Sequence, residues 1–241
     1  MKEEELQINK ARAFYYTLLG IFFSYQGIKR HQELAMQILG QIFANPINDQ
    51  TQKDSHILLA ELEQNGSERI LEEFDKLFID NFSQKAISLT ASYYDEGWEF
   101  GEKCLKIRDL ILESEFRKSE EFVEPEDHLG FLLLFCASLL EKSNPCSIAM
   151  CKKVFNDVMN DYVNFVVLEI LKSKNAKFYK SIAKILGSFA EFERMYLEIT
   201  PPPLEEYVDL ESLRKEDKKS KWKKRSKTEV SEEDIGKGRG V

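Results

Sequence analysis

The amino-acid sequence predicts an all-α fold: a single globular helical domain of about seven to nine helices, followed by a disordered, charged C-terminal tail. Three observations predict this class. Apolar residues recur at helical spacing along almost the whole chain. Only 11 Gly and 6 Pro occur in 241 residues, whereas antiparallel β folds need many turns built from such residues. No β-hairpin signal and no internal repeat is present.

The N-terminal half of the chain is expected to contain five helices. Each is marked by an apolar stripe, and they are expected at residues 6–23, 34–42, 57–62, 67–78 and 93–118. Asn45-Pro46 ends the second helix, and Asn65-Gly66 breaks the chain after the third. Ser67 is expected to cap the fourth helix. Residues 80–90 show no clear period and are therefore expected to form a loop.

A polar linker then leads into three further helices, expected at residues 129–140, 146–171 and 176–199. The first of these is apolar on nearly every face, so it must lie at the centre of the fold. Thr200 and the three prolines after it end the last helix. The expected organisation is an N-terminal helical region (residues 1–118), a hinge linker (119–123), a C-terminal helical region (124–200) and a disordered charged tail (201–241).

The net charge of −8 is unevenly distributed. Residues 211–241 carry eleven Lys/Arg against seven Asp/Glu, a net charge of +4, which leaves 23 against 35, or −12, on the remaining chain. Such an acidic body repels nucleic acid and favours a basic peptide or a basic partner surface. The sequence therefore predicts no nucleic-acid partner.

Several other classes of protein are also disfavoured. The N-terminus is acidic where a secretory signal would be basic, and the longest apolar runs are too short to span a bilayer. A cytoplasmic protein with no integral membrane segment is expected. The four cysteines form no Cys-x-x-Cys pair, and no glycine-rich phosphate loop, G-x-S-x-G or H-E-x-x-H motif occurs. We therefore expect no metal, no cofactor and no catalytic residue.

The most informative motif is Glu124-Pro125-Glu126-Asp127-His128, directly before the most apolar helix. One interpretation is a plain helix start, with Pro125 at the first helical position and the acids in the first turn. That interpretation does not explain His128, a potential cation near the positive end of a helix. It also does not explain why acids open such an apolar helix.

The motif, E-P-x-D-H before an apolar helix, resembles the hallmark of the TorD/DmsD family, cytoplasmic chaperones for molybdenum-containing redox enzymes exported by the twin-arginine pathway. Other segments agree in order and spacing over residues 6–199: Phe74-x-x-Leu77-Phe78, Ser92-Tyr93-Tyr94-Asp95, Phe100-Gly101, Phe155 with Tyr162, and Phe178-Tyr179 with Ala183. The sequence departs from the family in having no proline in 84–91, and Val158-Met159 where a His-Leu pair is usual.

The resemblance implies a TorD-like fold that binds the leader and the apo body of a client enzyme before cofactor insertion and export. A twin-arginine leader needs carboxylates for its arginines and an apolar groove for the segment that follows. Asp127 and Glu124 could supply the carboxylates, with Pro125 in the same turn. His128 could hold Asp127 or contact the peptide, with a charge that responds to pH near neutrality. The groove could be formed by Phe74, Leu77, Phe78 and Tyr94, although core packing is an equal alternative for the two phenylalanines.

Two other functions stay open at this point. One is an enzyme or nucleotide-hydrolysing factor that uses Asp127 and His128 as an acid–base pair. The other is a helical interaction protein with no leader specificity. The chain is expected to be a monomer, or a dimer that exchanges helical halves about the 119–123 linker. The sequence does not identify the client enzyme.

Overall fold

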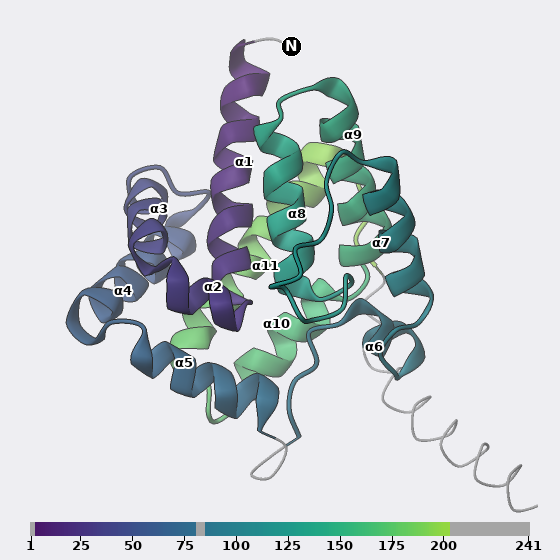
Figure 1. Ribbon diagram of the computed structural model, residues 1–241. Coiled ribbons are helices and arrows are strands. Elements are labelled where there is room, and N and C mark those ends of the chain that lie inside the picture. Colours follow the sequence, from purple (N-terminus) through teal and green to yellow (C-terminus); the bar gives the residue numbers. More distant parts are fainter. Residues whose placement is uncertain (1–2, 81–84, 203–241) are drawn as a thin grey trace, which may run out of the picture. The chain divides into compact units, whose positions relative to one another are not determined.

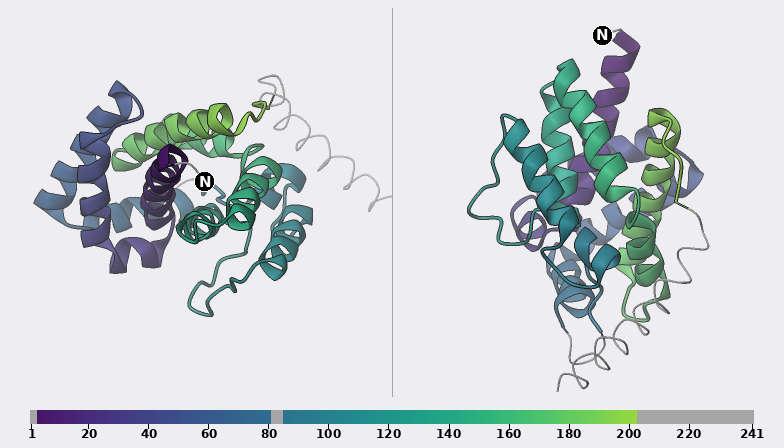
Figure 2. Two further views of the ribbon diagram at one scale, coloured as in Figure 1. Left: turned by 90° about the horizontal axis from the view of Figure 1, so that it is seen from above. Right: turned by 90° about the vertical axis from the view of Figure 1, so that its right-hand side faces the viewer.

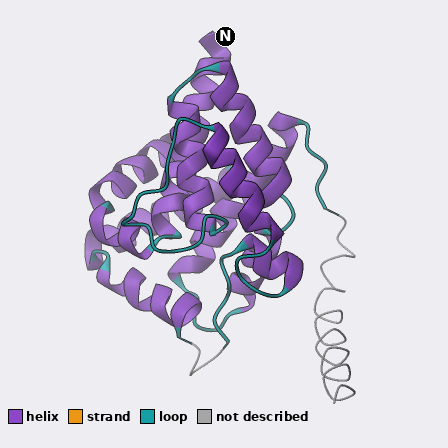
Figure 3. Ribbon diagram, turned by 45° about the vertical axis from the view of Figure 1, so that its right-hand side comes forward, coloured by secondary structure: helices purple, strands orange, loops and turns teal. Residues whose placement is uncertain are grey.

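The computed structural model describes residues 3–80 and 85–202, and within them the protein is helical (Figure 1). Eleven α-helices and two short π-helical segments follow one another: α1 (Glu3–Phe22), α2 (Tyr25–Arg30), α3 (Gln32–Ala44), α4 (Asp49–Asn65), α5 (Glu68–Phe74), η1 (Asp75–Ile79), α6 (Ala91–Glu96), α7 (Glu102–Glu113), α8 (Leu129–Glu141), α9 (Pro145–Val154), η2 (Phe155–Met159), α10 (Val163–Lys172) and α11 (Phe178–Leu197). The described residues form no strand, and helix and loop account for all of them in Figure 3. The predicted all-α class is confirmed.

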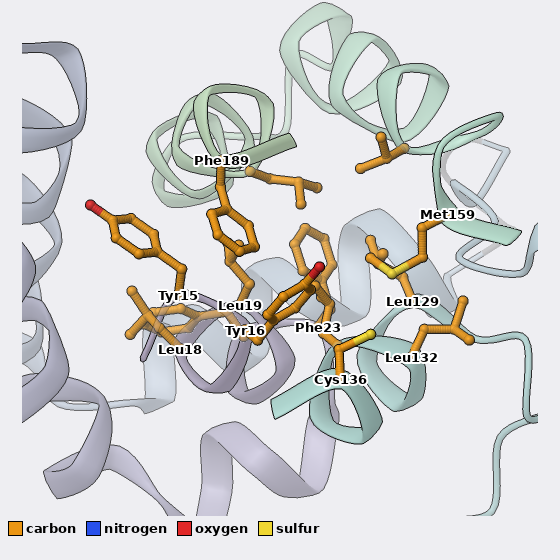
Figure 4. Packing of buried hydrophobic residues seen from close by; sticks show 14 of the residues in the cluster. Tyr15, Tyr16, Leu18, Leu19, Phe23, Leu129, Leu132, Cys136, Met159 and Phe189 are labelled. Carbon is orange, nitrogen blue, oxygen red and sulfur yellow. The ribbon is translucent and has the colours of Figure 1, made fainter. Parts of the chain in front are cut away.

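The core is organised around α1 and α8, which pack along each other more extensively than any other pair of helices. Seen from above, α3 and α4 lie on one side of α1, and α7 to α9 lie on the other (Figure 2). Helix α8 buries ten of its thirteen residues, as its unbroken apolar sequence predicts. The two helices approach closely at Gly20, where an added Cβ would lie 2.7 Å from the Leu134 side chain. Figure 4 shows Tyr16 of α1 near Cys136 of α8 and Phe189 of α11 in this core.

A buried ion pair joins α1 to α11. Arg12 Nε lies 2.6 Å from Glu193 Oε1, and both side chains are fully buried. The Tyr16 hydroxyl donates to Glu193 Oε2 at 2.7 Å, and Arg12 Nη1 donates to Asn9 Oδ1 at 2.7 Å. These bonds satisfy the buried charges, as burial of an ion pair requires.

The described residues belong to one compact unit. The two expected helical regions, residues 1–118 and 124–200, share one core, because α1 packs on α8 and α4 packs on α11. An exchange of halves about residues 119–123 remains a prediction. The expected disordered tail lies outside the described residues from 203 onward. Between residues 3 and 202, leaving aside 81–84, no helix combines the length and apolar character needed to cross a bilayer.

Two helices near the N-terminus differ from the expectation. Helix α2 is not expected from the sequence; it has only six residues and begins where the Ser24 side chain accepts from Gly27 N. Helix α4 begins eight residues before the expected start at residue 57, because Asn48 Oδ1 caps it by accepting from Thr51 N at 2.8 Å. Its first turns bury polar side chains and therefore lack an apolar stripe. The expected capping role of Ser67 is wrong, since its side chain makes no capping bond.

The expected helix over 93–118 is wrong as a single element. Helix α6 ends at Gly97, whose φ of 83° is left-handed, and α7 covers only Glu102–Glu113. The expected helix over 146–171 is likewise divided into α9, η2 and α10, because a π-helical turn at 155–159 shifts the hydrogen bonding. These divisions, together with α2, raise the number of helices above the predicted seven to nine. The expected boundary at Asn144-Pro145 is confirmed, with Asn144 Oδ1 accepting from Ser147 N at 2.8 Å.

Candidate functional site

The Glu124–His128 motif forms a turn that precedes α8 and does not form its first helical turn. His128 N donates to Pro125 O at 3.1 Å, and the helix begins at Leu129 with His128 as N-cap. His128 Nδ1 accepts from Gly130 N at 3.2 Å. The interpretation that places Pro125 at the first helical position is therefore wrong. The motif is a structured turn on the N-terminal side of the central helix.

This turn is bonded to the start of α6, which lies 35 residues earlier in the chain. Leu129 N donates to Leu89 O at 2.7 Å, and Ala91 N donates to Asp127 O at 3.1 Å. Asp127 Oδ2 accepts from Ser92 N at 2.8 Å, so its side chain caps α6 from a distant segment. Two of the sequence segments that resemble the TorD/DmsD family are thus in direct contact.

Asp127 is fully buried. Within the described residues its Oδ1 atom has no hydrogen-bond partner, and neither does the buried hydroxyl of Tyr162. A guanidinium arriving from solvent would have no open path to this carboxylate. The bonds that Asp127 does make connect the turn to α6, so the structure gives this residue a positioning role.

His128 is also buried, and its environment fixes its protonation state. Burial lowers the pKa of the imidazole to about 3, and the nearby charge of Lys118 acts in the same direction. The ring is therefore neutral at neutral pH, and the expected charge that responds near neutrality is wrong. A neutral ring also removes the difficulty of a histidine at the positive end of a helix, because Nδ1 acts as a hydrogen-bond acceptor.

A cavity of about 450 Å³ opens beside this turn. Its walls come from α5 and η1, the segment 85–90, α6, the loop between α6 and α7, and the turn itself. Five of the eight candidate site residues line it: Phe74, Phe78, Glu124, Pro125 and His128. The fold thus places two distant family-like segments, 74–78 and 124–128, around one opening.

The other three candidate residues do not line the cavity. Leu77 and Asp127 are fully buried, and Tyr94 is 3% exposed. The Tyr94 hydroxyl donates to Glu169 Oε2 at 2.6 Å and also lies 3.0 Å from Ser88 O. Its ring stacks on Tyr162 and Phe165. Leu77, Tyr94 and Asp127 therefore support the site without lining it.

The structure shows core packing for the two phenylalanines, while a role in binding a leader stays a prediction. Phe74 is buried, and Phe78 is partly buried; their rings meet edge to face with centroids 4.9 Å apart. Each ring also packs against the Tyr179 ring of α11, with centroid distances of 6.2 Å for Phe74 and 5.0 Å for Phe78. They are core residues whose outer surfaces form one wall of the cavity.

Sequence reasoning missed several lining residues, above all Lys85, Tyr93 and Glu99. Lys85 Nζ lies 5.4 Å from the centroid of the Tyr93 ring. The carboxylates of Glu99 and Glu124 form no ion pair with another described residue. Tyr93 could have been found, because it belongs to the Ser92–Asp95 segment of the family resemblance. Lys85 and Glu99 lie in irregular segments that show no pattern.

Glu126 of the same turn has a different role. Arg108 Nη2 lies 2.9 Å from Glu126 Oε2, and Lys118 Nζ lies 3.7 Å from Oε1. Partial burial would raise the pKa of this carboxyl, but the hydrogen bond from Arg108 and the two cations outweigh it and lower the pKa. Glu126 is thus occupied in holding the turn against α7.

The chain is similar to known proteins in three comparisons. The model of the nitrate reductase delta subunit family matches residues 44–167, just over half of the chain. The chaperone protein TorD of Shewanella piezotolerans is 23% identical over 193 residues, which cover 74% of this chain and 88% of that protein. A solved structure described as a redox enzyme maturation protein from Archaeoglobus fulgidus has a TM-score of 0.49 and 20% identity, and it covers 75% of this chain and 92% of the other.

The family match extends from the end of α3 into α10, so it includes both segments that meet at the cavity. It confirms the TorD/DmsD resemblance found in the sequence. The chain therefore belongs to the nitrate reductase delta subunit family.

Proposed function

We propose that the protein is a cytoplasmic chaperone for the maturation of an exported molybdenum-containing redox enzyme, and that the cavity beside Glu124–His128 binds the client's twin-arginine leader. One observation carries this proposal. The cavity combines carboxylates that have no ion-pair partner in the described chain with an apolar wall formed by Phe74, Phe78 and Ile79. A twin-arginine leader has the complementary pattern, a basic region followed by an apolar one.

The residues at and around the cavity have three roles in this proposal. Phe78 and Ile79 provide the surface for the apolar part of the leader, and Glu124 attracts its arginines. His128 and Pro125 line the cavity together with Glu124. The segments around the cavity are held in place by three positioning residues, Asp127, Leu77 and Tyr94. The acidic character of the chain outside residues 211–241 favours the approach of a basic leader.

No observation favours the acid–base alternative for Asp127 and His128. Asp127 is closed off from solvent, and His128 Nδ1 is occupied by Gly130 N. A helical interaction protein without leader specificity is the alternative that experiment must separate. In that case the client's folded or partly folded body would bind equally well with its leader removed.

Titration calorimetry with twin-arginine leader peptides from molybdenum-enzyme precursors of the same organism tests the proposal. Glu124→Gln should weaken binding about tenfold, the equivalent of ~1.4 kcal/mol for one charge-assisted hydrogen bond. Glu120→Gln is the matched control, because Glu120 is exposed, carries the same charge and does not line the cavity. Its affinity should equal that of the unmodified protein.

A second measurement uses the precursor with and without its leader. The proposal expects capture of the full precursor and a much weaker interaction with the leaderless form. Equal capture of both forms, or equal affinities for the Glu124→Gln and Glu120→Gln variants, would contradict leader recognition at this cavity.

A further inference from the structure

The cavity already holds a cation of the protein's own. Lys85 is exposed, and its ammonium lies over the face of Tyr93, 5.4 Å from the ring centroid. Both residues line the cavity. The face of an aromatic ring attracts cations, and it attracts the planar, weakly hydrated guanidinium of arginine particularly well. Tyr93 therefore presents a cation-binding surface that a lysine of the same chain now covers.

Two carboxylates line the same space from separate loops. Glu124 belongs to the turn before α8, and Glu99 belongs to residues 97–101 between α6 and α7. Their acidic neighbours are otherwise occupied: Glu96 accepts from Glu102 N, and Glu126 pairs with Arg108. With His128 neutral, the charged groups that line the cavity among the described residues are two carboxylates and one ammonium. One further positive charge would balance them.

The loop that carries Glu99 has an unusual backbone. Phe100 has a φ of 62°, a left-handed backbone conformation that residues other than glycine adopt at a cost, and the residue is 60% exposed. Gly97 is left-handed at one end of the loop, and Gly101 is the N-cap of α7 at the other. Glu99, which lies between these two glycines, lines the cavity.

We propose that one guanidinium of the client's arginine pair stacks on Tyr93 between the carboxylates of Glu99 and Glu124, in the place that Lys85 occupies in the free protein. Glu99, Tyr93 and Lys85 are then the residues that determine specificity for arginine over lysine. A guanidinium is planar and can accept a stacking ring and two carboxylates at once, whereas an ammonium is a compact point charge. This inference rests on the proposed leader-binding function and deepens it.

The test compares two leader peptides that differ only in an Arg-Arg or a Lys-Lys pair, each titrated against the full chain. The unmodified protein should bind the Arg-Arg peptide about tenfold more tightly than the Lys-Lys peptide. Glu99→Gln and Tyr93→Leu should each weaken Arg-Arg binding about three- to tenfold and reduce that preference. Lys85→Met should strengthen Arg-Arg binding by about three- to tenfold, because it removes the internal competitor.

Asp95→Asn is the control, since it removes one negative charge from an exposed position of α6 that does not line the cavity. Its Arg-Arg to Lys-Lys ratio should equal that of the unmodified protein. Lys85 and Glu99 are exposed, so their variants should retain the thermal unfolding temperature and report on binding alone.

The inference and the proposed function fail in different ways. If both peptides bind with equal affinity, or if Lys85→Met lowers Arg-Arg affinity, the guanidinium site is wrong while leader binding stands. If neither peptide binds the unmodified protein, the proposed function is wrong, and the inference falls with it.

Discussion

The buried imidazole of His128 should make the protein less stable in mild acid, and the size of the effect follows from its environment. Burial lowers the pKa of His128 to about 3 in the folded state, compared with about 6.5 in an unfolded chain. Below pH 6.5 the unfolded chain therefore binds a proton that the folded protein does not. Stability from this residue is fully present above pH 6.5, and it is lost progressively as the pH falls toward 3. Between pH 7.5 and pH 5 the loss is about 2 kcal/mol.

The measurement is the free energy of unfolding in denaturant at a series of pH values, for the unmodified protein and for His128→Asn. Asparagine is a good N-cap, so the variant keeps a side-chain acceptor before α8 while it removes the titrating group. The substitution also removes the packing of the imidazole on Phe122, whose ring centroid lies 6.1 Å away. This loss lowers the free energy of unfolding by an amount that does not depend on pH. The stability advantage of the unmodified protein should therefore shrink by about 2 kcal/mol between pH 7.5 and pH 5.

His56→Asn serves as the control, because it removes an exposed imidazole and leaves His128 in place. The pH dependence of this variant should follow that of the unmodified protein. If the difference between the unmodified protein and His128→Asn stays constant from pH 7.5 to pH 5, then His128 titrates alike in both states and the burial argument is refuted.

Three further predictions concern stability, and unfolding in denaturant checks each of them. The carboxylate of Glu73 accepts hydrogen bonds from three backbone N–H groups at the start of α11, at 2.7, 3.1 and 2.8 Å. Glu73→Ala should therefore lower the free energy of unfolding by about 1–2 kcal/mol. A comparable loss in the exposed control Glu72→Ala would contradict this capping role. Gly130→Ala should cost about 1–3 kcal/mol, because its Cβ would lie 2.3 Å from Phe23 O; Gly187→Ala, whose Cβ would meet only Val167 at 3.7 Å, should cost nothing. Arg12→Met should lower the free energy of unfolding by about 3–5 kcal/mol, because it leaves Glu193 charged and buried. If this uncompensated charge is the cause, the double variant Arg12→Met with Glu193→Leu should recover much of the loss.

The sequence predicted the helices whose apolar stripes are long. The stripes over 6–23 and 176–199 correspond to α1 and α11, and the uniformly apolar run over 129–140 corresponds to the central helix α8. The spacing of apolar residues shows directly which face of a helix is buried, so these helices can be predicted from the sequence. The family resemblance also located the turn at Glu124–His128 and the aromatic segment at 74–78, which the fold brings to the walls of one cavity.

The sequence was less informative wherever a helix begins or ends on a bond from a distant segment. Nothing near Ser92 shows that Asp127 caps α6, and nothing near Lys177 shows that Glu73 caps α11. The division of the expected helix over 93–118 depends on the backbone turn at Gly97, because the apolar pattern continues beyond it. These bonds join residues that become neighbours only after the chain has folded.

Composition and helical spacing alone thus determined that the chain is helical, that α8 is central, and that the body is acidic. Tertiary structure decided which charges are available for binding. It buried Asp127 and neutralised His128, two residues that the motif had suggested as ligands, and it brought Glu99 and Lys85 from irregular loops to the cavity. The physical reason is that a periodic pattern of apolar residues shows which face of a helix is buried. The protonation and exposure of a polar side chain, by contrast, depend on every segment that packs around it.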